Sequence, residues 1–435
     1  PSSIQHKFSD NNEITTCGPN ATDAIAPMML SRNSVNEIVY TYDVKWLESP
    51  ITWATRWDHL LKVSDAYRRI QWFSIINSAL IVFFLTLLVA LVMLRTLWRD
   101  FARYNNLDDQ EEVREESGWK LVHGDVFRSP FSPELLAIFI GIGAQLCLVF
   151  TVTVFFALLG FFSPANRGGL LTGMLVFWAM SSFVSGFISA HLYETMGGTR
   201  KRTVTLLSSF AYSGLAFAIF FIMNVFAMFL HSTEAVPFLT LVLLTVGWLV
   251  VSIPLAFAGG FFGYRVPPFG YPCRINTVPR EIPKYSVIPP WIFTLISGIL
   301  PFGVIFIQLV FIMNSLWQGQ LYYMFGFLFL VFVLMSITAA ETSVVLTYLT
   351  LVNEDYHWWW KSFFASGSLG IYMYIYSIIF LCTQPLIKEM HFVSMIMYLS
   401  YMFLISLGGM LLAGTIGFYS SFFFVKTIYG AIHVD

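Results

Sequence analysis

Residues 291–340 read WIFTLISGILPFGVIFIQLVFIMNSLWQGQLYYMFGFLFLVFVLMSITAA and contain no Asp, Glu, Lys or Arg. An α-helix needs about 20 mainly apolar residues to cross a bilayer, so this stretch alone holds two candidate transmembrane helices. Helices are the expected form, because lipid cannot satisfy unpaired backbone groups and the runs are longer than a barrel strand. The stretch predicts an all-α polytopic membrane protein.

The whole chain has the composition of a membrane protein. Of its 435 residues, 57% are hydrophobic and only 11% are charged, whereas a soluble domain has about 25% charged residues. The net charge of −1 gives no reason to expect nucleic acid as a partner. Four cysteines are too scattered to suggest a disulfide framework or a zinc site. We expect no metal and no cofactor.

Apolar runs along the chain predict nine transmembrane helices. Polar or proline-rich loops separate them, and the loop at residues 265–290 carries seven prolines, which excludes a helix there. The predicted spans are residues 73–94, 135–161, 169–192, 205–230, 236–262, 290–313, 321–350, 362–382 and 393–424.

Four domains are expected. Residues 36–46 alternate as a strand does, so residues 1–54 are interpreted as the end of a β-rich lumenal domain. The chain has neither an initiating Met nor a signal peptide, so we expect the front of that domain to be missing. Residues 55–72 are predicted to form an interfacial lead-in helix, with a simple linker as the alternative. A nine-helix membrane domain (73–425) and a cytosolic tail (426–435) follow.

Lys and Arg predict the orientation of the chain. The loops after the first, third, fifth and seventh spans, together with Lys426, carry 15 of these residues. The alternate loops carry Arg167 and Lys388. Because cytoplasmic loops are the basic ones, we expect a lumenal N-terminus and a cytosolic C-terminus. Asn20 begins the N-x-[ST] sequon of the chain and falls on the lumenal side, so it is a candidate glycosylation site.

Glu341 is the strongest candidate for a functional residue within the membrane. An ionised carboxylate at that depth is costly, so Glu341 is expected to be protonated, paired or facing a polar cavity. It is either a proton or ion site, a contact to a partner's transmembrane segment, or a neutral group bonded to a neighbouring helix. Gln308 and Asn314 are candidate neighbours in an intramembrane polar site.

Small residues recur at a spacing of four in several spans. Gly409, Ala413 and Gly417 line one face of the ninth span, and this spacing lets helix backbones approach closely. The face is expected either to pack inside the bundle or to dock helices of other membrane proteins.

No motif in the chain predicts an enzyme. HExxH, a GxSxG elbow, a Walker loop and an EF-hand loop are all absent from the sequence. We interpret His191 and Glu194 as residues at a membrane boundary. Residues 357–361 read HWWWK and predict an aromatic belt with a positive anchor.

Seven short blocks together resemble the nonaspanins, the transmembrane 9 superfamily. They occur in order from the first loop to the last helix, so the resemblance covers essentially the whole chain. The blocks are GWKLVHGDVFR (118–128), SPANRGGL (163–170), PREIPK (279–284), ILPFG (299–303), YYMFGFLFLVF (322–332), EDYHWWWKSF (354–363) and GTIGFY (414–419).

The resemblance implies a function in trafficking. Nonaspanins have a lumenal domain followed by nine membrane helices, and they reside in the Golgi and endosomes. They assist the export or surface localisation of other membrane proteins, especially clients with glycine-rich or polar transmembrane segments. The lipid bilayer and these clients are the partners that the resemblance implies.

The last residues of the chain resemble a family sorting signal. Nonaspanin tails commonly end in Lys-x-Asp or Lys-x-Glu, which the coatomer coat reads. Here the tail ends in His433, Val434 and Asp435, so His replaces Lys. Because neutral imidazole lacks a fixed positive charge, weaker or more pH-dependent coat binding is expected.

A secondary transporter or an ion or proton channel of the same membranes is the rival hypothesis. One buried acid and proline-interrupted helices are compatible with it. However, transporters usually have paired halves with helices broken at matching positions, and nine spans do not divide in this way.

Overall fold

The computed structural model describes residues 46–52, 65–105, 118–162, 168–230, 235–282, 289–317, 325–383 and 392–431. The chain divides into two compact units, Pro1–Arg56 and Trp57–Asp435. In the first unit, the described residues 46–52 have no regular secondary structure. Asn20 and nearly all of the strand predicted at 36–46 lie outside the described residues. Every contact below lies within the second unit.

The second unit is a bundle of α-helices. Among the described residues, nine helical spans are long and apolar enough to cross a membrane, which confirms the nine predicted spans and the all-α membrane fold. Two spans are broken, one between α7 and α8 and one between α10 and α11. The elements are α2 (Asp65–Asn105), η3 (Trp119–Val122), α3 (Pro133–Leu158), α4 (Gly169–Thr195), α5 (Lys201–Phe229), α6 (Phe238–Gly263), α7 (Pro290–Ser297), α8 (Ile299–Trp317), α9 (Phe325–Val352), α10 (Trp358–Gly367), α11 (Leu369–Thr383) and α12 (Phe392–Gly430).

The helices continue through two of the predicted domain boundaries. Residues 65–72, predicted to belong to a separate lead-in helix, are the first turns of α2. At the other end of the chain, α12 extends past Lys426 to Gly430. The first and last spans are therefore the longest helices of the bundle.

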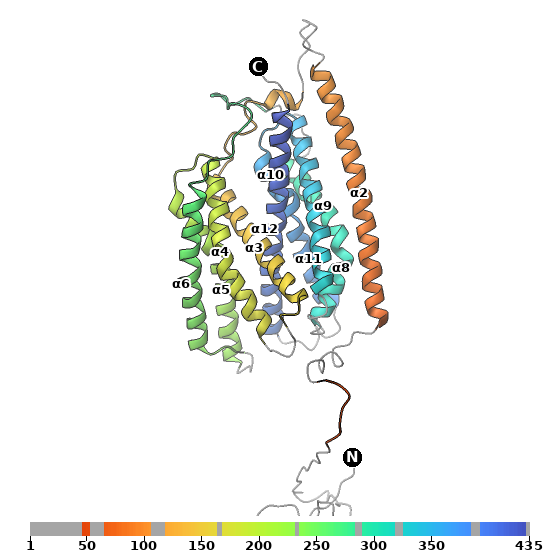
Figure 1. Cartoon of the computed structure of the whole chain (residues 1–435), viewed down its shortest axis with the longest axis vertical. Coiled ribbons are helices and arrows are strands. Elements are labelled where there is room, and N and C mark those ends of the chain that lie inside the picture. The colour runs from red at the N-terminus through yellow and green to blue at the C-terminus, as the bar shows by residue number, and fades with distance from the viewer. Residues whose placement is uncertain are drawn as a thin grey trace, which may run out of the picture. The chain divides into compact units, whose positions relative to one another are not determined.

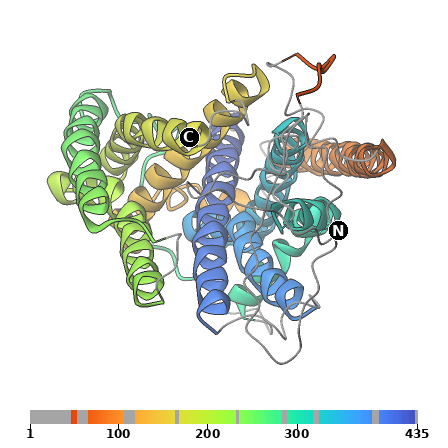
Figure 2. The same cartoon turned by 90° about the horizontal axis from the view of Figure 1, so that it is seen from below.

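Within the bundle, α12 and α3 occupy the centre (Figures 1 and 2). Helices α4, α5 and α6 pack on one side of this pair, and α8, α9, α10 and α11 pack on the other. Helix α2 lies at the outer edge beside α8 and α9, away from α6.

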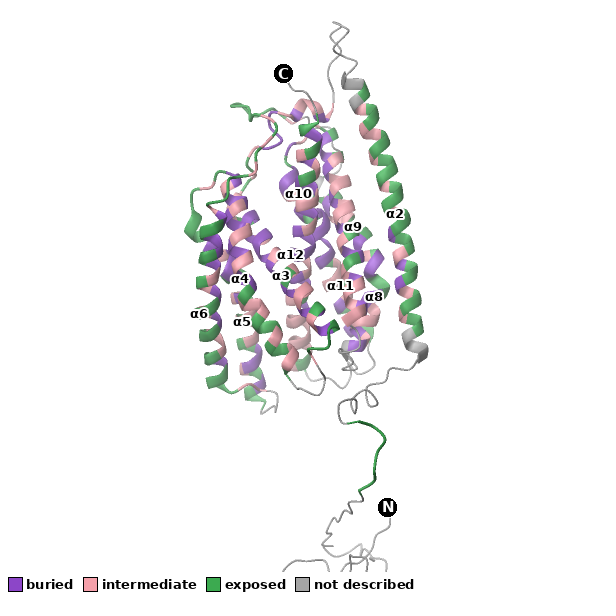
Figure 3. Ribbon diagram, viewed as in Figure 1, coloured by how far each residue is buried: buried purple, intermediate pink, exposed green. Residues whose placement is uncertain are grey.

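The distribution of side chains is the one expected for a protein surrounded by lipid. Large apolar residues such as Leu243 and Val250 on α6 point outwards, while Ser182, Ser185 and Ser189 on α4 are completely buried. Figure 3 shows buried positions towards the centre of the bundle and exposed positions along its outer helices. Association between helices in lipid lacks a hydrophobic driving force, so close packing and hydrogen bonds must replace it.

Glycines bring α4 and α6 into backbone contact. A Cβ atom added at Gly259 would lie 2.0 Å from the carbonyl oxygen of Phe183, and one at Gly186 would lie 2.1 Å from that of Ala256. A Cβ at Gly263 would lie 2.5 Å from the carbonyl oxygen of Phe187. Each of these atoms belongs to the backbone and cannot move aside, so any larger residue must push the two helices apart.

We predict that Gly259→Leu destabilises the bundle by about 1–3 kcal/mol, the usual cost of overpacking. Gly247→Leu is the matched control, because nothing lies within 4 Å of a Cβ at this position on the same helix. The thermal unfolding midpoint of each purified variant in nanodiscs measures the difference. Equal midpoints for the two variants would contradict the close α4–α6 contact.

Candidate functional site

Several of the sequence blocks meet at one end of the bundle, here called the basic end. It is formed by the loops after α2, α4, α6 and α9 and by the end of α12. Trp358 donates its indole N–H to the carbonyl oxygen of Val126, at 2.8 Å. Tyr429 donates its hydroxyl to the carbonyl oxygen of Trp119, at 2.7 Å. Residues from the first loop, the start of α10 and the last turn of the chain's final helix thus form one folded cap.

The predicted aromatic belt is wrong for Trp358 and Trp359. Their exposed fractions are 0% and 1%, and their rings stack on each other with centroids 4.6 Å apart. Phe418 of α12 packs against both rings. Only Trp360 is partly exposed, and its indole N–H donates to the carbonyl oxygen of Phe131 at 2.6 Å. The tryptophans form the core of the cap because the first loop folds over them.

A buried aspartate joins two loops of the cap. Asp125 is 2% exposed and accepts hydrogen bonds from Arg128 Nε at 3.0 Å and from the backbone N–H of Arg280 at 3.2 Å. The guanidinium of Arg280 also pairs with Glu354, at 3.0 Å. Arg128 donates to the carbonyl oxygen of Asn276, at 2.8 Å. Sequence reasoning did not single out these charges, although the blocks GDVFR and PREIPK contain them.

Asp355 lies at the turn between α9 and α10. Burial raises the pKa of Asp355, but hydrogen bonds from His357 and Lys361 outweigh burial and hold the pKa well below its ordinary value. The backbone N–H of His357 donates to Asp355 Oδ1 at 2.9 Å, and Lys361 Nζ contacts Asp355 Oδ2. The carboxylate therefore fixes the first turn of α10.

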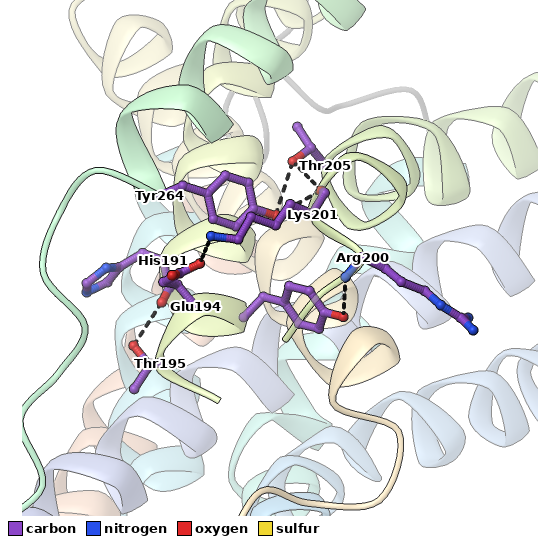
Figure 4. Close-up of polar contacts among 8 residues, drawn as sticks. His191, Glu194, Thr195, Arg200, Lys201, Thr205 and Tyr264 are labelled. Atoms are coloured by element: carbon purple, nitrogen blue, oxygen red, sulfur yellow. Dashed lines mark hydrogen bonds and ion pairs between the residues drawn. The ribbon is translucent and has the colours of Figure 1, made fainter. Parts of the chain in front are cut away.

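The turn between α4 and α5 carries a second group of polar contacts (Figure 4). Glu194 pairs with Lys201, and the carbonyl oxygen of Lys201 accepts the hydroxyl of Tyr264 at 2.9 Å. His191 points away from this pair in Figure 4 and packs its ring against Phe269, with centroids 4.4 Å apart. His191 and Glu194 thus contact different partners. Within the described ranges, no group of three or more His, Cys, Asp or Glu side chains could hold a metal ion.

Inside the membrane, Glu341 of α9 contacts α2. The hydroxyl of Thr86 is bonded to Glu341 Oε1 and lies 2.8 Å from the carbonyl oxygen of Val82. A hydroxyl has one hydrogen, so Thr86 cannot donate to both oxygens. Both bonds form when Thr86 donates to Val82 and a protonated Glu341 donates to Thr86. The geometry and the cost of an ionised carboxylate in lipid both favour the neutral acid.

Gln308 of α8 contacts the same helix at a different level. Its side chain is completely buried, and Nε2 donates to Ser78 Oγ at 2.5 Å and to the carbonyl oxygen of Ser74 at 3.3 Å. Ser78 and Thr86 are eight residues apart, a rise of about 12 Å along α2. The structure therefore places Gln308 and Glu341 on one seam with α2 but at separate points. Asn314 lies on α8, half-buried, six residues beyond Gln308.

The small-residue face predicted on α12 contacts helices of the same bundle. A Cβ atom added at Gly417 would lie 2.1 Å from Ser366 Oγ, and one at Gly409 would lie 3.2 Å from Met373 Sδ. Ala413 is completely buried, and its carbonyl oxygen accepts the hydroxyl of Ser366 at 2.9 Å. These positions are thus covered by α10 and α11.

A third polar contact attaches α2 at the basic end. Asp100 Oδ2 accepts the indole N–H of Trp119 at 3.0 Å and the hydroxyl of Tyr348 at 2.9 Å. The contact connects α2 to both η3 and α9. Asp100 was not singled out in the sequence, because a charged residue at the end of an apolar run is ordinary.

Comparison with known proteins decides the family. The sequence profile of the Endomembrane protein 70 family matches residues 1–390. The chain belongs to the Transmembrane 9 superfamily. All of it aligns at 43% identity with 68% of Transmembrane 9 superfamily member 9 of Arabidopsis thaliana. It also aligns over its whole length at 44% identity with 64% of member 2, and at 40% with 67% of member 4, both of Homo sapiens. No solved structure matches the chain.

Membership of the Transmembrane 9 superfamily makes the chain a multi-pass membrane protein of the endomembrane system. Three of the blocks on which the resemblance was first stated, at 118–128, 279–284 and 354–363, contribute residues to the basic end. The structure gives these blocks a shared role in forming the cap. The tail residues His433, Val434 and Asp435 lie outside the described residues.

We predict that the contribution of Asp355 to stability depends on pH. Because its pKa in the folded protein lies below the ordinary value of 3.8, the carboxylate stabilises the fold above about pH 4, and this stabilisation is lost as the pH falls further. The unfolding midpoint of the wild type should exceed that of Asp355→Asn at pH 7, and the gap should shrink below about pH 4. Glu281→Gln, an exposed carboxylate of the basic end, is the control. A gap that is constant from pH 7 to pH 3 would contradict the pairing.

Proposed function

We propose that this protein assists the sorting, export or surface localisation of other membrane proteins in the Golgi and endosomes by recognising their transmembrane segments. The main support for the proposal is the polar seam between α2 and the bundle. We use this name for the contacts of Gln308 and Glu341 with Ser74, Ser78 and Thr86 of α2. Gln308 and Glu341 project from two neighbouring helices and hold the hydroxyl-bearing face of a third. The same chemistry can hold a transmembrane helix of another protein.

The chemistry suits recognition within lipid. Lipid tails are as apolar as leucine, so they cannot distinguish an apolar helix from its neighbours. A hydroxyl, an amide or a neutral acid finds no hydrogen-bond partner in lipid, and each gains from meeting a second polar group. The clients expected to gain most are those with glycine-rich or polar transmembrane segments.

The proposed orientation places the basic end in the cytosol and the N-terminal unit in the lumen. The excess of Lys and Arg in the loops of this end supports the assignment. The tail after α12 begins at the same end, so it would meet the coatomer coat there. His433 carries less positive charge than the lysine of related tails, so the expected affinity for the coat is lower at neutral pH. The proposal assigns the chain no catalytic reaction and no cofactor.

A transporter remains the second candidate, because two broken spans meet at their breaks. A Cβ atom added at Gly298, between α7 and α8, would lie 2.0 Å from the hydroxyl of Ser368, between α10 and α11. Broken helices expose carbonyl groups that coordinate ions in many transporters. Here, however, the carbonyl oxygen of Leu295 already accepts the hydroxyl of Tyr372 at 2.9 Å, and that of Thr294 accepts Ser368 at 3.3 Å. Since hydroxyls of the chain occupy these carbonyls, the breaks fit a structural junction better than an ion site.

The test follows a reporter with a glycine-rich transmembrane segment in cells that lack this protein. Wild-type protein should restore sorting, and Glu341→Gln should restore most of it, because a neutral amide keeps the hydrogen bond. Glu341→Leu should fail. Ser336→Ala is the matched control on α9, since its hydroxyl bonds to Phe332 of the same helix.

Two outcomes would contradict the sorting function. If the reporter travels identically with and without the protein, the function is wrong. If Glu341→Gln fails as completely as Glu341→Leu, and the purified wild type conducts protons in liposomes while Glu341→Gln does not, the transporter is the correct function. The unfolding midpoint of each variant separates these results from misfolding.

A further inference from the structure

Helix α2 is among the least enclosed of the described spans. About 17% of its apolar stretch is buried, and the value is 22% for each of α4, α5 and α6. Its buried residues lie on a narrow stripe of Ile75, Ser78 and Val82. The remaining faces carry exposed apolar residues such as Phe83 and Leu88. In Figure 1 the helix lies at the edge of the bundle, beside α8 and α9.

The hydrogen bonds between α2 and the bundle are incomplete on both sides. Gln308 is completely buried, and its Oε1 has no hydrogen-bond partner although its Nε2 bonds to α2. Glu341 Oε2 is likewise buried without a partner. Buried polar atoms normally find partners, so each unpaired acceptor needs an explanation. Both belong to side chains that face α2, where the hydroxyl of Ser74 is likewise buried without a partner. Both acceptors are therefore open to a donor from a helix that binds in this place.

We propose that the face of α8 and α9 beneath α2 is a docking site for a client's transmembrane helix that carries hydroxyl or amide side chains. Helix α2 is the resident occupant, and a client takes its place. The inference deepens the proposed function and rests on it.

The pattern on α2 defines the client that fits. Its bonded positions are Ser74, Ser78 and Thr86, a spacing of i, i+4 and i+12. Ser74 contributes its backbone carbonyl, and Ser78 and Thr86 contribute hydroxyls. A client with serine, threonine, asparagine or glutamine side chains at i+4 and i+12 reproduces the side-chain contacts, and any residue at i supplies the carbonyl. It can also donate to Gln308 Oε1 and Glu341 Oε2.

The contact at the basic end keeps α2 attached during exchange. Asp100 is bonded to Trp119 and Tyr348, fourteen residues beyond Thr86. These bonds do not involve the seam, so the part of α2 that carries Ser78 and Thr86 can leave while this end stays bound. The expected movement is therefore a swing about the basic end.

The experiment measures capture of a synthetic helix by the purified full chain in liposomes. The matched probe is a leucine-rich transmembrane peptide with two serines eight residues apart and a photocrosslinker beside one of them. The control probe carries the same two serines at another spacing. The two sides of the seam are changed separately, with Ser78→Ala/Thr86→Val on α2 and Gln308→Leu/Glu341→Leu on the bundle.

The two double variants should have opposite effects. Weakening the α2 side should raise crosslinking of the matched probe by about threefold per lost contact. Weakening the bundle side should lower it to the level of the control probe. Thr96→Val on α2 should change nothing, because its hydroxyl bonds to Val92 of its own helix. A seam that only stabilises the fold predicts the same direction for both variants, and that result would overturn the proposal.

A second measurement keeps the seam intact. Spin labels at exposed Phe84 on α2 and Val333 on α9 should move apart when the matched probe is added, and should not move with the control probe. An unchanged distance would overturn the exchange of α2. If sorting of the cellular reporter still depends on the wild type, the proposed function survives that failure. If sorting of the reporter is also the same with and without the protein, both the exchange of α2 and the proposed function are wrong.

Discussion

Helices in a bilayer gain nothing from the hydrophobic effect when they associate, because the lipid around them is as apolar as their own side chains. This constraint explains the main contacts of the bundle. Backbone groups touch at Gly186 and Gly259, and buried hydroxyls and amides bond across helices, as Ser185 does to the carbonyl oxygen of Ser208 and Gln145 to that of Trp178. Small and polar residues thus connect the helices at these points, beside buried apolar residues such as Leu334 and Met335.

The basic end follows a different rule, since it lies where the helices emerge. There the chain builds a compact cap from loops that composition alone describes as connectors. Asp125, Trp358 and Tyr429 each bond to a segment far away in the sequence. The cap thus fixes the ends of α9, α10 and α12 relative to one another.

Hydropathy was enough to predict the nine spans, because a long apolar run has few alternatives to a membrane helix. It could not predict the breaks near Gly298 and Ser368, since averaging over a window hides a local change of direction. Trp358 and Trp359 have the composition of a membrane boundary, and only the fold of residues 118–128 makes them a core. The embedded polar groups Glu341 and Gln308 were found in the sequence as residues that need a partner.

Their partners on α2 could not be found in that way. Hydroxyls in helices commonly bond to a carbonyl of their own helix, as Thr96 does, so Thr86 carries no distinguishing signal. Pairing across 255 residues of sequence is visible only in the fold. The charges of Asp125 and Arg280 were missed for a similar reason, because loop charges are usually solvated.

We propose that the bundle binds transmembrane helices through hydrogen bonds that lipid cannot offer. The most direct measurement is the affinity of the wild-type protein, by fluorescence energy transfer in vesicles, for leucine-rich helices that carry two, one or no serines at matched positions. Each serine replaced by alanine should weaken binding by about threefold. Equal affinities for the three helices would contradict it.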